Sequence, residues 1–378
     1  MKSLNPMRQA RMIAPIIIGS VPTTLAQEQF QTFFPGWSDL ITNILEVNCS
    51  QDVEKFAKDP MGQARWDVVD CILGVFSESR KAEGVAAALT FGLAPMVLQN
   101  IGPSTSETSL LFLRRPFLAL LLAISSPWPS NPNSTKYDNP LYGLSQPIGL
   151  PMWPDIENRP RRVVASFVSL FEYALAMGAA ANVASLAYQL GHWSFFSSAN
   201  NVYDPVLWTY NALLIHIVGI IGIFLRVRVL DRHRNSHNAI EEREQTWLPL
   251  WLADELTPTA YNDNLRLEPR DSHLPSVLSL LIAWVLSIAP TLQVLMGTIM
   301  LSGSLLTSQA DARNCLFRYV GSAIVARALL WYELAGLRQA TSGVASVSYT
   351  PAGSTIELMD QGHSAETRQP SKSVGVSS

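Results

Sequence analysis

Apolar residues along this chain gather in long uninterrupted blocks. Residues 205–225 and 274–310 contain no Asp, Glu, Lys or Arg over 21 and 37 consecutive positions. A helix rises 1.5 Å per residue, so about 20 mostly apolar residues cross the hydrocarbon core of a bilayer. The core of a globular domain rarely needs apolar stretches of this length. The pattern therefore predicts membrane-spanning helices.

Six blocks are long or apolar enough to compete for the bilayer. Three of them contain at most one ionisable residue each: 163–190, 207–225 and 275–302. A fourth block, 84–101, is apolar but contains Pro95. The remaining two blocks, 110–127 and 315–337, carry charged residues. The first either spans, re-enters the membrane or lies in its interface, and the second spans only if packed against partners. The sequence predicts an all-α, polytopic membrane bundle of five or six spans within residues 83–338.

The regions on either side of the bundle differ from it in composition. Residues 1–82 form an N-terminal region, and its first 26 residues resemble a signal peptide whose apolar stretch is short and interrupted by Pro15. Residues 339–378 are rich in Ser, Thr, Gly and Pro and have no apolar period, which predicts a disordered tail.

Basic residues in the connections predict the orientation of the bundle, because Lys and Arg remain on the cytoplasmic side. Residues 127–162 contain four Lys or Arg and residues 226–274 contain seven, whereas residues 191–206 contain none. The long connection 226–274 is therefore predicted to be a cytoplasmic loop. Within it, the apolar residues 247–252 precede Glu255-Leu256-Thr257-Pro258, and we expect this patch to lie on the membrane or to cap the bundle.

The side of the N-terminal region stays open at this stage. In a six-span arrangement, 84–101 and 110–127 form a hairpin and the N-terminus is cytoplasmic. In a five-span arrangement, 110–127 rests on the cytoplasmic interface and the N-terminal region lies outside, which places Arg114 and Arg115 on the side that basic residues prefer.

The five-span arrangement also brings modification sites into the right compartment. The sequon at Asn48 becomes a candidate for glycosylation, and Cys49 and Cys71 become candidates for a disulfide. A second sequon at Asn133 falls in a connection that the basic residues place inside.

Composition supports a membrane protein and excludes several other classes. The chain is 48% hydrophobic and 15% charged, against about 25% charged in an ordinary soluble domain. Its net charge of −3 offers no basic surface for nucleic acid, so the lipid bilayer is the one partner that we expect. No hydrolase, metalloprotease or phosphate-loop motif is present in the sequence, and no cofactor is predicted.

Three polar residues inside predicted spans are the leading site candidates, because burying them in lipid is costly. Counted from the ends of their blocks, Glu172 and His216 lie about 13 Å deep and Arg327 about 16 Å deep, so we expect all three to meet near the midplane. Such a set is able to bind an anion or relay a proton. The interpretation we favour is a buried Glu172–Arg327 ion pair with His216 hydrogen-bonded beside it.

Two other polar features have plain structural explanations beside functional ones. Gln293 lies one turn after Pro290, where it either satisfies a carbonyl that the proline frees or lines a cavity. His233 and His237 have the i, i+4 spacing of a metal pair, but a juxtamembrane helix facing anionic headgroups explains them better. No metal site is predicted.

Several stretches resemble a group of uncharacterised multi-pass membrane proteins of filamentous fungi. They are 62–73, 108–127 with its Arg114-Arg115-Pro116, 255–258, and 297–338 with its Asp311-Ala312-Arg313 and Glu333-Leu334. The resemblance covers roughly residues 60–338 and implies a polytopic protein whose N-terminal region looks secreted. It brings no activity and no catalytic residue, and the poor signal-like start of this chain departs from it.

The sequence thus predicts an integral membrane protein, in the plasma membrane or an endomembrane, without enzymatic activity. It would serve as a structural or interaction protein, or as a small-solute or proton pathway built on the midplane set. The alternative is a lipid-modifying or redox enzyme that uses the cytoplasmic histidines.

Overall fold

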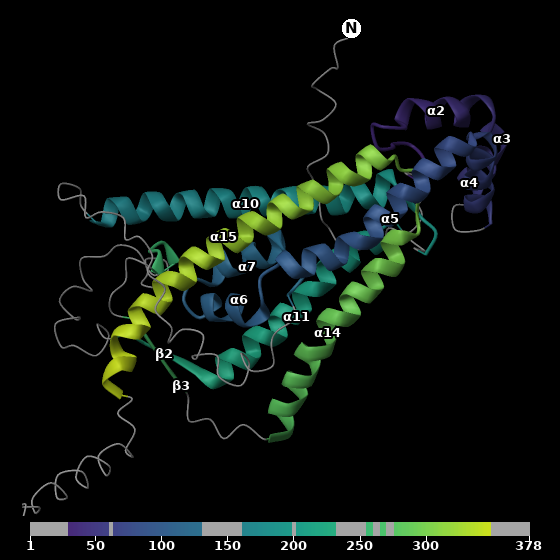
Figure 1. The fold of residues 1–378 in the computed structure, drawn as a ribbon. Coiled ribbons are helices and arrows are strands. Elements are labelled where there is room, and N and C mark those ends of the chain that lie inside the picture. The colour runs from purple at the N-terminus through teal and green to yellow at the C-terminus, as the bar shows by residue number, and fades with distance from the viewer. Residues whose placement is uncertain are drawn as a thin grey trace, which may run out of the picture.

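The computed structural model describes residues 29–59, 63–130, 161–198, 202–231, 255–259, 265–269 and 276–348. The fold is helical, as the sequence predicts, with two short antiparallel strand pairs. Figure 1 shows a small group of helices, α2 to α4, at one end of a bundle of long helices, and the pair β2–β3 at the opposite end.

The N-terminal helices form a small core of their own. They are α2 (Ser38–Val47), α3 (Ser50–Lys58) and α4 (Ala64–Val75). Helices α2 and α3 are amphipathic, and α2, for example, buries Ile41, Ile44 and Leu45 on one face. A disulfide between Cys49 and Cys71, with Cα atoms 6.0 Å apart, joins the start of α3 to α4. Phe195 and Leu306, from two connections of the bundle, complete this core.

Within the described residues, five helices are long and apolar enough to cross a membrane. They are α5 (Glu78–Ile101), α10 (Arg161–Trp193), α11 (Asp204–Arg226), α14 (Ser276–Ser302) and α15 (Gln309–Ser348). Their outward faces carry large apolar side chains such as Phe167, Leu280 and Phe317, which are at least 65% exposed. Helices that are apolar on both faces suit a lipid environment, and the chain is a multi-pass integral membrane protein.

The block 110–127 does not form a span, which corrects the six-span expectation. It is split into α6 (Thr105–Phe112) and α7 (Pro116–Ser125), which are too short to cross a bilayer. The chain breaks because Pro116 cannot continue a helix and disfavours helical geometry at the preceding residue, where Arg115 has φ −127° and ψ 76°. We call residues 105–125 the broken helix.

Three of the long helices, α10, α11 and α15, pack against the broken helix, and α5 and α14 pack against other long helices. Helix α5 lies against α14 and α15, α10 lies against α15 and α7, and α11 lies against α6 and α14 (Figure 1). Small side chains on α10, including Ala176, Ala179 and Ala180, are buried in these contacts and allow close approach of the helices.

Strand pairs mark the two ends of the bundle. Strand β1 (Phe195–Phe196) pairs with β4 (Ser304–Leu305) beside the N-terminal helices. Strand β2 (Val227–Asp231) pairs with β3 (Leu265–Pro269) at the other end. Helix α15 continues to Ser348, so residues 339–348 are helical, which corrects the predicted start of the tail at residue 339; residues 349–378 lie outside the described residues.

Candidate functional site

The most conspicuous polar feature of the bundle is a fully buried arginine in the break between α6 and α7. Arg115 caps the N-terminus of α7, and its side chain is 0% exposed. A guanidinium can leave water in this way only when carboxylates and other acceptors surround it.

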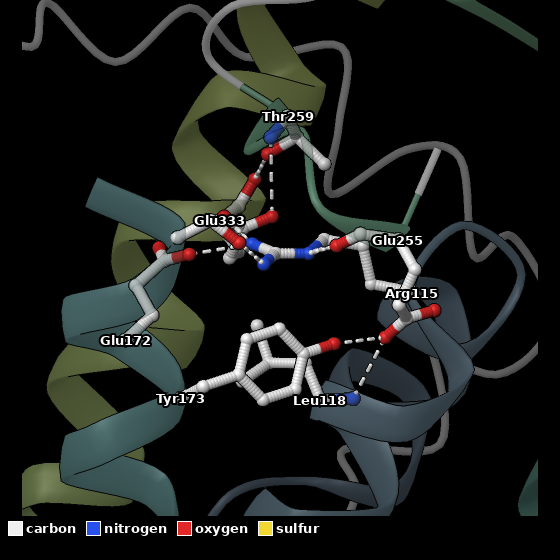
Figure 2. A network of polar contacts seen from close by, with 8 residues as sticks. Arg115, Leu118, Glu172, Tyr173, Glu255, Thr259 and Glu333 are labelled. Carbon is white, nitrogen blue, oxygen red and sulfur yellow. Dashed lines mark hydrogen bonds and ion pairs between the residues drawn. The ribbon is translucent and has the colours of Figure 1, made fainter. Parts of the chain in front are cut away.

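Acceptors from three other parts of the chain surround Arg115 (Figure 2). Its Nη1 donates to Glu172 Oε2 on α10 at 2.5 Å and to Glu333 Oε1 on α15 at 2.6 Å. Its Nη2 donates to Ser169 Oγ at 2.7 Å, and its Nε donates to the backbone carbonyl of Glu255 at 2.8 Å. One side chain therefore ties the broken helix to α10, to α15 and to a turn of the long connection.

The turn at residues 255–259 docks through its own polar groups as well. The Glu255 carboxylate accepts hydrogen bonds from the backbone N–H of Leu118, at 3.0 Å, and from the hydroxyl of Tyr173 (Figure 2). The backbone N–H of Thr259 donates to Glu333 Oε2 at 3.2 Å, and its hydroxyl donates to the Glu333 carbonyl at 2.5 Å. Glu255 and Thr259 are both buried, so the turn is an integral part of this site.

We refer to these residues as the Arg115 cluster: Arg115, Ser169, Glu172, Tyr173, Glu255, Thr259 and Glu333. Its carboxylates outnumber the guanidinium that they surround. Burial disfavours the charged arginine, but the carboxylates of Glu333 and Glu172 outweigh this effect and raise the pKa of Arg115. Glu172 Oε1 and Glu255 Oε2 are buried and accept no hydrogen bond from the part of the chain that the structure describes.

A second ion pair joins the broken helix to α15. Arg327 Nη1 binds Glu107 Oε2, and the same carboxylate closes a capping box with Ser104 at the start of α6. Burial disfavours ionised Glu107, but Arg327 and the Ser104 donors outweigh it and lower the pKa of this carboxyl. The expected Glu172–Arg327 pair is not formed, because each residue has a partner on the broken helix instead.

His216 also contacts the broken helix. Its Nδ1 lies 2.9 Å from the hydroxyl of Thr108 on α6, and the ring is buried. The three residues expected to meet one another therefore bind three different positions of the broken helix: Arg115, Glu107 and Thr108. Neither Arg115 nor Glu107 is among the site residues that the sequence predicts. The Ser104-x-x-Glu107 spacing, which is typical of a capping box, is the sequence signal that could have identified Glu107.

Gln293 connects two of the long helices. Its side-chain amide donates to the Trp208 carbonyl at 2.6 Å, and the Trp208 indole N–H donates to the Gln293 carbonyl at 3.1 Å. Gly297 on the same face of α14 lies under this indole, where a Cβ atom would come within 2.2 Å of the ring. The residue thus bridges α14 to α11, whereas we expected it to satisfy its own helix or line a cavity.

The other sequence candidates fall into two groups. Asn48 is exposed at the end of α2, and Cys49 and Cys71 form the disulfide described above. Asn133, His233 and His237 lie outside the described residues. Within the described ranges, no group of three His, Cys, Asp or Glu side chains is arranged to hold a metal ion.

Comparisons with known proteins add no relationship. No protein-family model matches the chain, and neither the curated proteins nor the solved structures contain a match.

Proposed function

We propose that this is a non-enzymatic integral membrane protein of the structural or interaction kind, in which the bundle holds the cytoplasmic loop in place through the Arg115 cluster. The observation that carries the proposal is the convergence on one buried guanidinium of the broken helix, α10, α15 and the 255–259 turn. Polar groups that bind one another across helices stabilise the arrangement of those helices in lipid.

The Arg115 cluster also anchors the loop that connects α11 to α14. Strand β2 ends at Asp231, and the chain docks again at Glu255, so both flanks of residues 232–254 are anchored to the bundle. The sequence of that stretch contains basic residues and Trp247 and Trp251. Basic and aromatic side chains are suited to anionic headgroups and to the surface of a protein partner. We infer that the bundle serves to present this stretch at the membrane surface.

Release of the turn tests the proposal directly. Glu255→Ala removes the carboxylate that binds Leu118 and Tyr173, so we expect trypsin to cleave the loop after Arg232, Arg234 or Arg243 several times faster in membrane vesicles open to the protease. Glu83→Ala is the matched control, because Glu83 forms an exposed pair with Arg80. Equal cleavage rates in both variants and the wild type would contradict the proposal that the Arg115 cluster holds the loop in place.

A proton pathway is the second candidate, and one observation favours it. The carboxylates of Glu172 and Glu333 bind the same Nη1 atom of Arg115, and two buried carboxylate oxygens of the cluster have no hydrogen-bond partner among the described residues. Two carboxylates that share a site retain a proton more readily than one alone.

Glu172→Gln separates the two candidates. If the cluster conducts protons, the variant folds normally and the protein loses a proton flux that purified wild type shows in liposomes with an internal pH dye. If the cluster is structural, the wild type shows no flux above that of empty liposomes and the variant is less stable.

A further inference from the structure

The sequon at Asn48 has an unusual position, because its middle residue is a disulfide cysteine. Asn48 ends α2 with its side chain exposed, Cys49 is 0% exposed and bonded to Cys71, and Ser50 begins α3. The residue that would carry a glycan and the residue that forms the bridge are therefore neighbours in the chain.

The folded backbone holds all three sequon residues in place. The N–H groups of Asn48 and Cys49 both donate to the Ile44 carbonyl, at 2.9 and 3.1 Å. The Cys49 carbonyl accepts from the N–H groups of Asp52 and Val53, both at 3.1 Å. Asn48 has helical φ and ψ of −104° and −34°. A glycosyl transferase must seat the Asn amide and the Ser hydroxyl together on an accessible, extended segment, which this geometry does not offer.

The surroundings of the sequon agree with an extracytoplasmic position. The N-terminal core includes Phe195 and Leu306, which belong to the connections 194–203 and 303–308. These connections contain no Lys or Arg, which is the composition of loops on the far side of a membrane. A disulfide persists on that side and not in the cytosol.

We propose that Asn48 is an N-glycosylation site that is accessible only until Cys49 pairs with Cys71, so that the two modifications compete during synthesis. In glycosylation, the Asn48 Nδ2 attacks the anomeric carbon of an oligosaccharide linked to a lipid pyrophosphate. The carbon–nitrogen bond forms, the carbon–oxygen bond to pyrophosphate breaks, and Nδ2 loses one proton to a base.

Disulfide formation closes the site. The two thiols lose two protons and two electrons to an oxidising disulfide of the compartment, which is reduced to two thiols. Pairing draws Cys49 into the core, and the hydrogen bonds at Ile44 then lock the segment. Because the folded Asn48 side chain points to solvent, a glycan added earlier remains compatible with the fold.

The experiment measures the fraction of chains whose mass falls on endoglycosidase treatment, in full-length protein carrying Asn133→Gln. We expect partial occupancy in this background, none after Asn48→Gln, and at least twofold higher occupancy after Cys71→Ser, which keeps the sequon intact. Cys315→Ser is the matched control, since Cys315 is a buried free cysteine in α15. Addition of a reductant during synthesis raises occupancy when Cys71 is present and leaves the Cys71→Ser value unchanged.

Ile41→Ala distinguishes competition from slow folding. It weakens the same core while leaving both cysteines, so its occupancy stays below that of Cys71→Ser. Absence of the glycan from every variant, equal occupancy with and without Cys71, or an equal rise in Ile41→Ala would each overturn the proposal.

Discussion

Replacing Arg115 by methionine tests the physical basis of the fold. The substitution keeps an unbranched side chain of similar length and removes the charge that contacts Glu172 and Glu333, whose side chains are 2% and 0% exposed. Removing one partner of a buried ion pair costs about 3–5 kcal/mol, because the remaining charge is uncompensated. This loss lowers the folding equilibrium constant by about a hundredfold to a few thousandfold. It is a large part of the free energy of unfolding of a typical protein, which is about 5–15 kcal/mol.

The assay is equilibrium unfolding of detergent-solubilised protein, with monodispersity on size exclusion as an independent readout. Arg80→Met is the control, because the Arg80 side chain is 47% exposed and its pair with Glu83 is worth at most about 1 kcal/mol. We expect Arg115→Met to be the less stable of the two by several kcal/mol.

A second variant makes the reasoning refutable. Arg115→Met combined with Glu172→Gln and Glu333→Gln removes the uncompensated charges together, and replacing a whole buried ionic group is often close to neutral. The triple variant is therefore expected to recover most of the lost stability. If Arg115→Met is as stable as Arg80→Met, or if the triple variant is no better than the single one, the cluster does not hold the bundle together.

Three further predictions concern other contacts. The lowered pKa of the Glu107 carboxyl stabilises the folded state at pH values above the ordinary pKa of 4.5, and this contribution is lost as the pH falls through the lower folded-state pKa. The difference in melting temperature between wild type and Glu107→Gln should therefore shrink as the pH falls below 4.5. Cys71→Ser opens a bridge between residues 22 positions apart and should cost about 3 kcal/mol, seen as faster proteolysis of the N-terminal helices and absent when Cys315 is replaced. Gln293→Leu removes the amide donor to the Trp208 carbonyl and should lower stability by about 1 kcal/mol in the unfolding assay; no change would show that the bridge between α11 and α14 contributes nothing.

Some errors of sequence reasoning have a clear physical origin. Depth along a helix follows from residue number, so Glu172, His216 and Arg327 were predicted at similar depths. Contact also requires that the helices be neighbours and that the faces carrying these residues meet. Residue number predicts neither which helices are neighbours nor which faces meet. The broken helix lies between them and takes each residue as its own partner.

The block 110–127 shows a related limit. Its apolar residues, together with Arg114 and Arg115, were compatible with a span or with a segment on the cytoplasmic interface, and composition alone could not predict two short helices buried among other helices. In the structure, Arg115 holds this block as two short helices inside the bundle, because its charge requires acceptors that α10, α15 and the 255–259 turn supply together.

By itself the sequence determined that the chain is a membrane protein and located its long apolar helices, because transfer of apolar segments to lipid depends on local length and composition; it left open whether the block 110–127 spans. It also offered Cys49 and Cys71 as candidates for a disulfide, on the condition that the N-terminal region lies outside. Only the tertiary structure decided which charges pair, that Arg115 joins four parts of the chain, and that the 255–259 turn belongs to the bundle. These contacts link residues 54 to 220 positions apart, and their energies depend on burial and direction, which arise only once the helices have packed.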